Sequence, residues 1–323
     1  MPQAPEFWAR AGFVSDLLAP LGWAYGALGA ARRAATRPVR VGVPTICIGN
    51  LTAGGAGKTP VVLSLAALLR ARGRKPHILS RGYGGSLTGP LQVEAARHTA
   101  GEVGDEPLLL AAAAPTWIGG DRIASAQAAI AAGADILLLD DGFQNPALHY
   151  DIALLVVDGG YGFGNGRVMP AGPLREPVAT GLARAGAVVM IGDNVSRLAF
   201  GTVPMLGARL AAVAAADLRG ARVFAFAGIG RPAKFFATLT ELGAAIAWIR
   251  EFPDHHPYRD GELDTLAAAA QAKSATLITT EKDWVRLPAA WRDKIRALEV
   301  ELRWDDPAAL ERILAPALER AHG

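Results

Sequence analysis

The chain of 323 residues contains a single cysteine, Cys47. One cysteine excludes disulfides within the chain and zinc sites made from several cysteines, and it suits a reducing compartment. The sequence also lacks long blocks of lysine or arginine, and it lacks the interleaved aromatic and basic residues typical of single-strand nucleic-acid binders. Its net charge is only +3. We therefore expect no nucleic acid among its partners, and no obligate protein partner is evident.

The most distinctive segment is a glycine-rich loop made of Thr52, Ala53, Gly54, Gly55, Ala56, Gly57, Lys58 and Thr59. It follows an apolar run at residues 45–48 and precedes a helix-like segment at residues 60–72. This order predicts a phosphate-binding loop, because backbone N–H groups and the helix N-terminus converge on an anion. Lys58 is expected to reach the β- and γ-phosphates of ATP, and Thr59 to bind Mg²⁺. Thr52 stands where the usual pattern begins with glycine.

The N-terminal region carries an apolar stretch, residues 11–31, followed by several arginines. Asp16 would cost roughly 2.5–3.5 kcal/mol near the centre of a membrane span, and Pro20 weakens such a span further. Apolar residues at helical spacing predict instead a helix that lies in the membrane interface. They are Val14, Leu17, Leu18, Leu21, Tyr25 and Leu28, with Trp8 and Trp23 available at headgroup depth. A spanning anchor and an ordinary helix packed on the domain are the alternatives. The arginines favour a cytoplasmic membrane face.

Beyond the loop, strand-like and helix-like segments alternate. Strands are expected at residues 76–80 and 136–139, and helices at residues 105–114 and 121–132. Such alternation predicts a mostly parallel sheet with helices on both faces, and ligands then bind at the carboxyl ends of the strands. Asp140 and Asp141 follow the second strand, placed as in a Walker B motif that holds Mg²⁺. A turn or helix cap is the alternative for this pair.

Asp105 and Glu106 form a second acidic pair, where a loop becomes a helix. By local rules Asp105 caps that helix, with Pro107 in its first turn. The functional alternative is that one carboxylate accepts a proton from a substrate hydroxyl. A base works best with a pKa near the working pH, so the pKa of Asp105, ordinarily about 4, would have to be raised by burial, by Glu106 or by a histidine partner.

A second, smaller α/β unit is predicted from residue 221 onward. Its expected strands cover residues 223–227, 244–249, 276–279 and 298–304, and its expected helices cover residues 233–242 and 262–272. The predicted organisation is a membrane-associating N-terminal segment (1–40), a P-loop kinase core (41–205), a linker (206–220) and a smaller domain (221–323). Domains of this kind close over a substrate to exclude water.

These segments together resemble one family, the tetraacyldisaccharide 4'-kinases, which phosphorylate the lipid A precursor on the cytoplasmic side of the bacterial inner membrane. The matching strings are GNLTAGGAGKTP (49–60), SRGYGG (80–85), GDEP (104–107), DDGFQ (140–144), GNG (164–166), PAGPLRE (170–176), FAGIGRP (226–232), DHHPY (254–258) and TEKD (280–283). They run in family order across nearly the whole chain, and the family's own loop variant includes Thr52. Asn145 replaces the usual histidine, so we assign that position no role.

The resemblance implies an ATP- and Mg²⁺-dependent kinase for the 4'-hydroxyl of a tetraacyldisaccharide 1-phosphate, bound peripherally or monotopically to the inner leaflet. It implies that Asp105 is the general base, tuned by His255, although a solvated loop histidine is the alternative for His255. Further implied roles are phosphate and Mg²⁺ organisation by Glu106, Asp140 and Asp141, and substrate contacts by Arg81, Tyr83, Arg175 and Glu176. Tyr83 has a packing role as its alternative.

Two other functional classes stay open. The first is a non-kinase P-loop GTPase or ATPase that acts as a membrane-associated positioning or delivery module. Against it, the sequence has no Asn-Lys-x-Asp motif for reading guanine, and Ala53 stands where partitioning-type ATPases carry a second lysine. The second is a soluble small-molecule kinase, which the apolar stretch at residues 11–31 disfavours.

Overall fold

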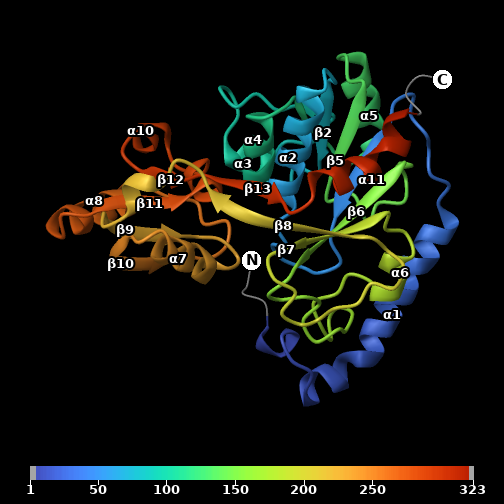
Figure 1. The fold of residues 1–323 in the computed structure, drawn as a ribbon, viewed down its shortest axis with the longest axis horizontal. Helices are drawn as coiled ribbons and strands as arrows, with labels where there is room; N and C mark the ends of the chain where they lie inside the picture. Colours follow the sequence, from blue (N-terminus) through green and yellow to red (C-terminus); the bar gives the residue numbers. More distant parts are fainter. Residues whose placement is uncertain (1–4, 320–323) are drawn as a thin grey trace.

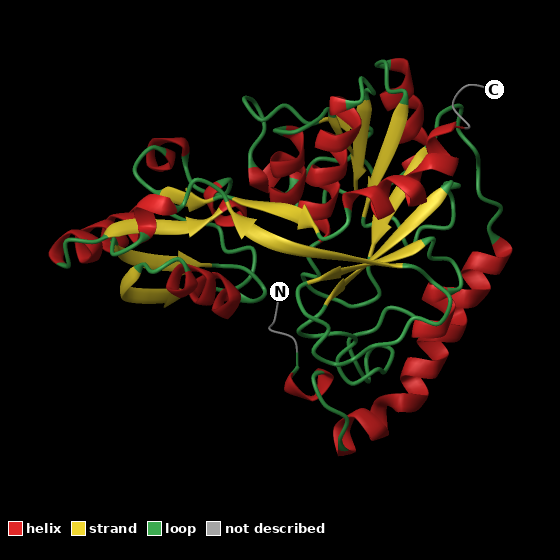
Figure 2. Ribbon diagram, in the orientation of Figure 1, coloured by secondary structure: helices red, strands yellow, loops and turns green. Residues whose placement is uncertain are grey.

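The computed structural model describes residues 5–319, and within them the chain forms a nine-stranded sheet and a four-stranded sheet (Figures 1 and 2). The large sheet contains β1 (Thr45–Gly49), β2 (Pro76–Ser80), β3 (Leu91–Gln92), β4 (Thr116–Ile118), β5 (Ile136–Asp140), β6 (Ile152–Asp158), β7 (Ala187–Ile191), β8 (Met205–Ala212) and β13 (Val300–Trp304). The small sheet contains β9 (Arg222–Ala227), β10 (Ala245–Glu251), β11 (Thr276–Thr280) and β12 (Arg296–Leu298).

Helices cover both faces of the large sheet and flank the small one (Figure 2). They are α1 (Phe13–Ala35), α2 (Lys58–Ala71), α3 (Ala100–Val103), α4 (Asp105–Ala111), α5 (Arg122–Ala131), α6 (Val178–Leu182), α7 (Pro232–Glu241), α8 (Asp260–Ala272), α9 (Glu281–Trp284), α10 (Ala289–Arg292) and α11 (Pro307–Glu319), with 3₁₀ turns at Glu6–Trp8 and Ala216–Leu218. The predicted α/β fold with a smaller C-terminal domain is confirmed.

The large sheet has the strand order β13-β8-β7-β6-β1-β5-β2-β4-β3. Its central strands run parallel, and only the edge strands β3 and β13 pair antiparallel with their neighbours. Every residue of β1 and β5 is buried, as expected for parallel strands covered by helices on both faces. Ile48 of β1 pairs with Asp140 of β5, so this register places the acidic pair beside the start of the phosphate loop.

The expected linker and the expected last strand both need correction. Residues 205–212 form β8, a strand of the large sheet, rather than a connection between domains. The expected strand at residues 298–304 is split, because β12 joins the small sheet whereas β13 returns to pair with β8. The chain therefore crosses between the sheets twice.

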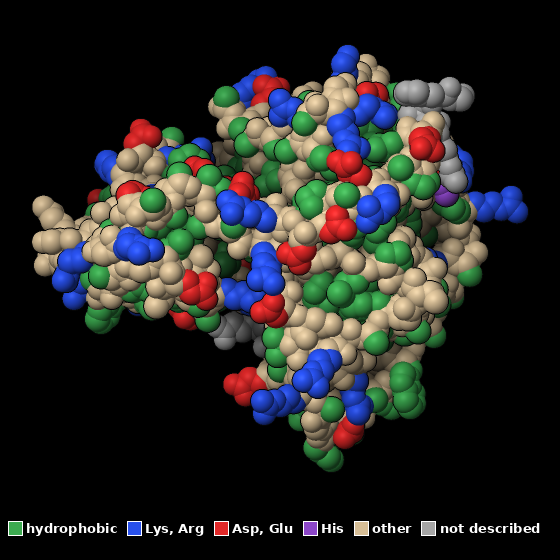
Figure 3. Space-filling view, viewed as in Figure 1, with side chains coloured by type: hydrophobic (Ala, Val, Ile, Leu, Met, Phe, Trp, Pro, Cys, Tyr) green, Lys and Arg blue, Asp and Glu red, His purple; other side chains and the backbone are tan. Residues whose placement is uncertain are grey.

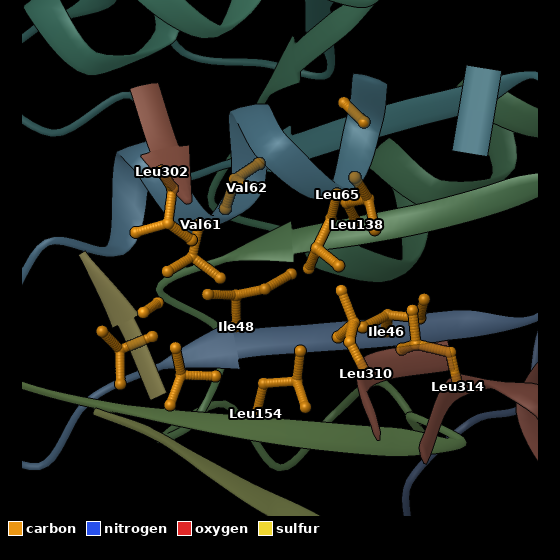
Figure 4. Close-up of a cluster of buried hydrophobic side chains, with 14 of the residues drawn as sticks. Ile46, Ile48, Val61, Val62, Leu65, Leu138, Leu154, Leu302, Leu310 and Leu314 are labelled. Atoms are coloured by element: carbon orange, nitrogen blue, oxygen red, sulfur yellow. The ribbon is translucent and has the colours of Figure 1, made fainter. Parts of the chain in front are cut away.

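The C-terminal segment also belongs to the large domain. Leu302 of β13 and Leu310 and Leu314 of α11 pack in the same core cluster as α2 and β1 (Figure 4). Burial of these leucines against the large sheet explains why the chain returns there. The expected segments 1–40 and 221–323 include residues 1–4 and 320–323, which lie outside the described residues.

Helix α1 lies along the outer edge of the large domain (Figure 1). Its small residues Ser15, Gly22 and Gly26 face the protein and are buried. A Cβ added at Gly22 would lie 2.6 Å from the carbonyl oxygen of Val168, so only glycine permits this approach. Arg167 fixes the first turn by donating to the carbonyl oxygen of Ser15 at 3.0 Å and by pairing with Asp16.

The large apolar residues of α1 point away from the protein. Phe13, Leu17, Trp23 and Leu28 are each more than two thirds exposed. Hydrophobic side chains are visible along the lower edge of the molecule, where α1 runs (Figure 3). Leu18 departs from the expected outer stripe, because it is partly buried. Among residues 5–319, no helix combines the length and apolar character needed to cross a bilayer.

Candidate active site

The phosphate loop, residues 52–59, connects β1 to α2 at the carboxyl edge of the large sheet. Gly57 precedes α2 with a left-handed φ of 86°, and a Cβ there would lie 2.5 Å from Cδ1 of Ile191. A side chain at this position would therefore clash as well as strain the backbone. Gly54 and Gly55 are exposed, whereas Thr52, Ala56 and Thr59 are buried and Ala53 is partly buried.

Backbone and amide hydrogen bonds hold the loop in place. The N–H of Ala53 donates to the carbonyl oxygen of Pro173 at 2.7 Å, and the N–H of Arg175 donates to that of Leu51 at 2.7 Å. The side chain of Asn50 donates to the carbonyl oxygen of Thr52 at 2.8 Å. No role for Asn50 was predicted from the sequence, although it stands two residues before the loop in the family string.

Lys58 is buried and faces two groups at the base of the loop. Its Nζ lies 3.3 Å from Oδ1 of Asn50 and 3.4 Å from Oδ1 of Asp141. Arg175 holds the other side of that carboxylate, with Nη1 2.9 Å from Oδ2 of Asp141. Burial raises the pKa of Asp141, but the charges of Lys58 and Arg175 outweigh this and lower it. Asp141 therefore carries a full negative charge beside the lysine.

Asp140 is almost fully buried at the end of β5. Its Oδ2 accepts a hydrogen bond from the hydroxyl of Ser80 at 3.1 Å, whereas its Oδ1 has no partner among the described residues. Burial, reinforced by the negative charge of Glu106, raises the pKa of Asp140 to about 7. An orphaned buried carboxylate oxygen next to a phosphate loop fits a Mg²⁺ ligand.

The oxygen atoms of Asp140 and Thr59 suit Mg²⁺ better than a metal ion whose ligands all come from the protein. Within residues 5–319, no cluster of three or more His, Cys, Asp or Glu side chains is arranged for a metal ion. Mg²⁺ is usually held by one or two carboxylates together with substrate phosphates and water. Asp140 and the Thr59 hydroxyl in the first turn of α2 match that pattern.

Asp105 meets His255 across the two domains. Nδ1 of His255 lies 2.9 Å from Oδ2 of Asp105, which is 4% exposed, and Nε of Arg286 lies 3.6 Å from the same oxygen. Asp105 is the first residue of α4, with Gly104 at the cap position, so the expected helix cap is not what this side chain forms. Sequence reasoning brought Asp105 and His255 together through the resemblance, and it missed Arg286.

The protonation of this pair differs from the expectation. Burial raises the pKa of Asp105, but the hydrogen bond from His255 and the positive charges of Lys282 and Arg286 lower it to about 2. The hydrogen bond to Asp105 raises the pKa of His255 against the effect of burial. A histidine partner was expected to raise the pKa of the carboxyl, whereas a protonated histidine stabilises the carboxylate instead.

Glu106 forms a second contact across the domains, an ion pair with Lys282 of α9. Burial raises the pKa of Glu106, but the positive charges of Lys282 and Lys58 outweigh the effect of burial, so the pKa is lowered. Lys282 belongs to the TEKD string, yet no role was inferred for it. The signal that could have identified Lys282 is its position in the first turn of a helix that directly follows a strand.

The other expected site residues differ in position. Tyr83 is half-exposed, with its ring centroid 6.3 Å from that of His255, and Arg81 is exposed on the same loop. Glu176 is 1% exposed and is held by both nitrogens of the Arg184 fork at 2.9 Å. The expectation that Glu176 lines the site therefore needs correction, because its carboxylate is buried among protein partners.

A third contact joins the domains away from the acidic pairs. Asp158, at the end of β6, pairs with Arg231 at 2.7 Å and also with Lys234. The guanidinium of Arg231 also lies 4.2 Å from the ring centroid of Tyr161. Arg231 precedes α7 of the smaller domain, so this contact also joins the two domains.

Comparison with known proteins gives a consistent result. A family model described as tetraacyldisaccharide-1-P 4'-kinase matches residues 14–319. A tetraacyldisaccharide 4'-kinase of Rhodospirillum centenum is 56% identical over 98% of this chain and 97% of its own length. One of Gluconacetobacter diazotrophicus is 54% identical over 98% of this chain and 99% of its own length. A crystal structure of LpxK from Aquifex aeolicus in complex with ATP superposes with a TM-score of 0.78 at 26% identity, covering 95% of this chain and 100% of that one.

Proposed function

The chain belongs to the tetraacyldisaccharide 4'-kinase family, and we propose that the site described above transfers the γ-phosphoryl group of ATP to the 4'-hydroxyl of a tetraacyldisaccharide 1-phosphate. The observation that supports this assignment is that a phosphate loop and a carboxylate–histidine pair lie close together. A phosphate loop with a buried lysine opens at the carboxyl edge of the sheet. Asp105, which His255 of the smaller domain contacts, lies on α4, and α4 packs against the helix that follows the loop.

On the nucleotide side, the loop N–H groups and Lys58 bind the phosphates of ATP. Asp140 and the hydroxyl of Thr59 would hold Mg²⁺, and Glu106, which pairs with Lys282, lies near enough for its charge to act on Asp140. Mg²⁺, when bound, neutralises charge on the transferring phosphoryl group. Asp141 and Arg175 orient Lys58, because the lysine and the arginine share one carboxylate.

On the acceptor side, Asp105 is a carboxylate at neutral pH and orients and deprotonates the attacking hydroxyl. A low pKa makes it a weak base, which is sufficient because phosphoryl transfer passes through a loose transition state that depends mainly on positioning and charge. His255 holds the carboxylate through Nδ1 and supplies the positive charge that keeps it ionised. Since the two residues come from different domains, this arrangement forms only when the domains meet.

The reaction is tested by following transfer of labelled phosphate from ATP to the lipid disaccharide and to the same sugar without its acyl chains. We expect turnover with the lipid that depends on Mg²⁺. Hydrolysis of ATP or GTP with no labelled lipid would contradict the kinase assignment and favour a positioning or delivery NTPase.

We also propose that α1 docks the enzyme on the inner leaflet of the cytoplasmic membrane. Two features of α1 support this proposal. Its small residues pack against the protein while its large apolar residues are exposed, and the helix is followed by arginines that attract anionic lipid. Removing residues 1–31 is expected to abolish binding to anionic vesicles. Because that deletion also strips packing from the domain, the sharper variant replaces Leu17, Leu21 and Leu28 with glutamine.

The matched control replaces Trp248 and Ile249 with glutamine. These residues are also exposed, at 54% and 42%, but they lie on β10 of the smaller domain. Flotation with vesicles should be lost in the α1 variant and retained in the β10 variant. Equal flotation of the two variants would place the membrane contact elsewhere.

A further inference from the structure

Arg33, in the last turn of α1, forms an ion pair with the buried carboxylate of Glu176 in the large domain. Its Nη2 lies 3.3 Å from Oε2 of Glu176, and its side chain is 17% exposed although the rest of that turn is largely open to solvent. An arginine that only attracted lipid phosphates would point outward. Arg33 instead turns toward the protein, where it contacts Glu176 shortly before α6.

Glu176 is linked in turn to the phosphate loop. Its Oε1 accepts a hydrogen bond from Nε2 of Gln144 at 3.1 Å, and Oε1 of Gln144 accepts one from Arg175 at 3.2 Å. Arg175 holds Asp141, which holds Lys58. Gln144 also donates to the carbonyl oxygen of Asn50, the residue that braces the loop.

We infer that Arg33 is a positioning residue for the kinase reaction, acting through Glu176 and Gln144 on Arg175 and the phosphate-loop lysine. The inference rests on the proposed function, and it adds that α1 orders the nucleotide side of the active site besides attaching the protein to a membrane. The Arg184 fork contacts both oxygens of the Glu176 carboxylate, and Gln144 donates to Oε1. Arg33 adds a second guanidinium at Oε2, so α1 contributes to holding the carboxylate.

The chain offers a matched control in Arg32, which precedes Arg33 in the same turn and is exposed. Arg33→Met and Arg32→Met remove the same charge from the same turn of the helix, and the vesicle assay below measures how far each one changes lipid attraction. Only Arg33→Met breaks the contact with Glu176. Both full-length variants are assayed with detergent-dispersed lipid disaccharide at saturating ATP, and their binding to anionic vesicles is measured in parallel.

We expect Arg33→Met to lower kcat by about 3-fold to 30-fold with little change in the KM for lipid, since contacts along such networks typically contribute this much. Arg32→Met should keep kcat near the wild-type value, and Arg33→Lys should recover part of the loss. Equal kcat values for the Met variants would overturn the inference. If Arg33→Met does not fold, Arg33→Gln carries the same comparison with a side chain that keeps a donor.

A double-mutant cycle tests the route. In the Glu176→Gln background, Arg33→Met should lower kcat by less than about 2-fold, because the group through which it acts has already lost its charge. If the losses of kcat in the two single variants instead multiply in the double variant, Arg33 acts by another path and the route through Glu176 is overturned. Wild-type protein without any phosphoryl transfer would instead contradict the proposed function, which separates the two failures.

Discussion

The phosphate loop and the Asp105–His255 pair serve the same proposed reaction, but they depend on different parts of the chain. Lys58, Asp141, Arg175 and Asn50 all belong to the large domain and contact one another within it. The Asp105 and Glu106 carboxylates instead depend on His255 and Lys282, which the smaller domain supplies. The phosphate loop and its bracing residues are therefore held within one folded domain, whereas Asp105 and Glu106 have partners from both domains.

This comparison predicts the largest effect at the nucleotide side. Lys58→Ala should lower kcat by about 10²-fold to 10³-fold or more, because a preorganised charge at the phosphates is lost. The fold should persist. Turnover and calorimetry test this, with Lys75→Ala as a control at the opposite end of the sheet. Near-normal turnover in Lys58→Ala would contradict both the kinase mechanism and the comparison.

Asp105→Asn tests the acceptor side directly. We expect kcat to fall by about 10²-fold to 10⁴-fold, the usual contribution of a positioned base, with ATP affinity nearly unchanged because the nucleotide side is built independently. Single-turnover kinetics and ATP-binding calorimetry provide the measurement. Asp121→Asn is the control, since Asp121 caps α5 outside the site and asparagine also caps helices. A parallel loss of ATP affinity would show that the two sides are not independent.

His255→Ala should have a smaller effect, a fall in kcat on the order of 10-fold, because the base itself remains. Its signature is the pH profile. The hydrogen bond from His255 is the leading influence that lowers the pKa of Asp105 to about 2 against burial, so its loss should raise that pKa. The acidic limb of the kcat profile, where Asp105 becomes protonated, should then move to higher pH.

The neighbouring His256 supplies the control for this shift. It bonds to Glu262 within the smaller domain and does not contact Asp105. His256→Ala should leave the acidic limb where it is. An unmoved limb in His255→Ala would mean that the histidine does not set the protonation of the carboxyl.

Lys282→Met removes a contact between the two domains and leaves the proposed base, Asp105, in place. Removing the lysine leaves Glu106 without its partner, at a cost of about 1–3 kcal/mol of folding free energy for a hydrogen bond to a charged group. Mg²⁺ with ATP should offset part of this cost by supplying another cation near the carboxylate. Thermal unfolding with and without Mg²⁺–ATP tests the prediction, and Lys273→Met is the exposed control in the same domain. An equal loss in both conditions would argue against Glu106 facing the metal.

The smallest effect is expected at Asp158. Asp158→Asn weakens the contact with Arg231 and Lys234, both of which are partly exposed, so the KM for lipid should rise only about 2-fold to 5-fold. Raising the salt concentration should reduce the difference from wild type. Asp193→Asn, which loses a surface pair inside the large domain, is the control. A fall in kcat comparable to that of Asp105→Asn would place Asp158 in the chemistry instead.

Several local features of the site were predictable because short-range physics determines them. Strand β2 begins and ends at the predicted residues, and the apolar run before Asp140 forms a strand that ends at that aspartate. A glycine-rich turn between a strand and a helix has few alternatives, so the position of the phosphate loop followed from the residue types alone. The resemblance to a known family added the pairing of Asp105 with His255, which no local rule predicts.

The tertiary structure decided what depends on distant partners. Residues 205–212 and 300–304 pair with each other and join the large sheet, although their strand patterns are compatible with either sheet. Glu176 is held in its buried position by Arg184, and Asp105 acquired a low pKa because His255, Lys282 and Arg286 from the smaller domain converge on its carboxylate. The amino-acid sequence by itself determined the phosphate loop and the strand ends, because backbone conformation and apolar burial act over a few residues. Charge pairing across 150 residues, as between Asp105 and His255, required the folded domains to meet.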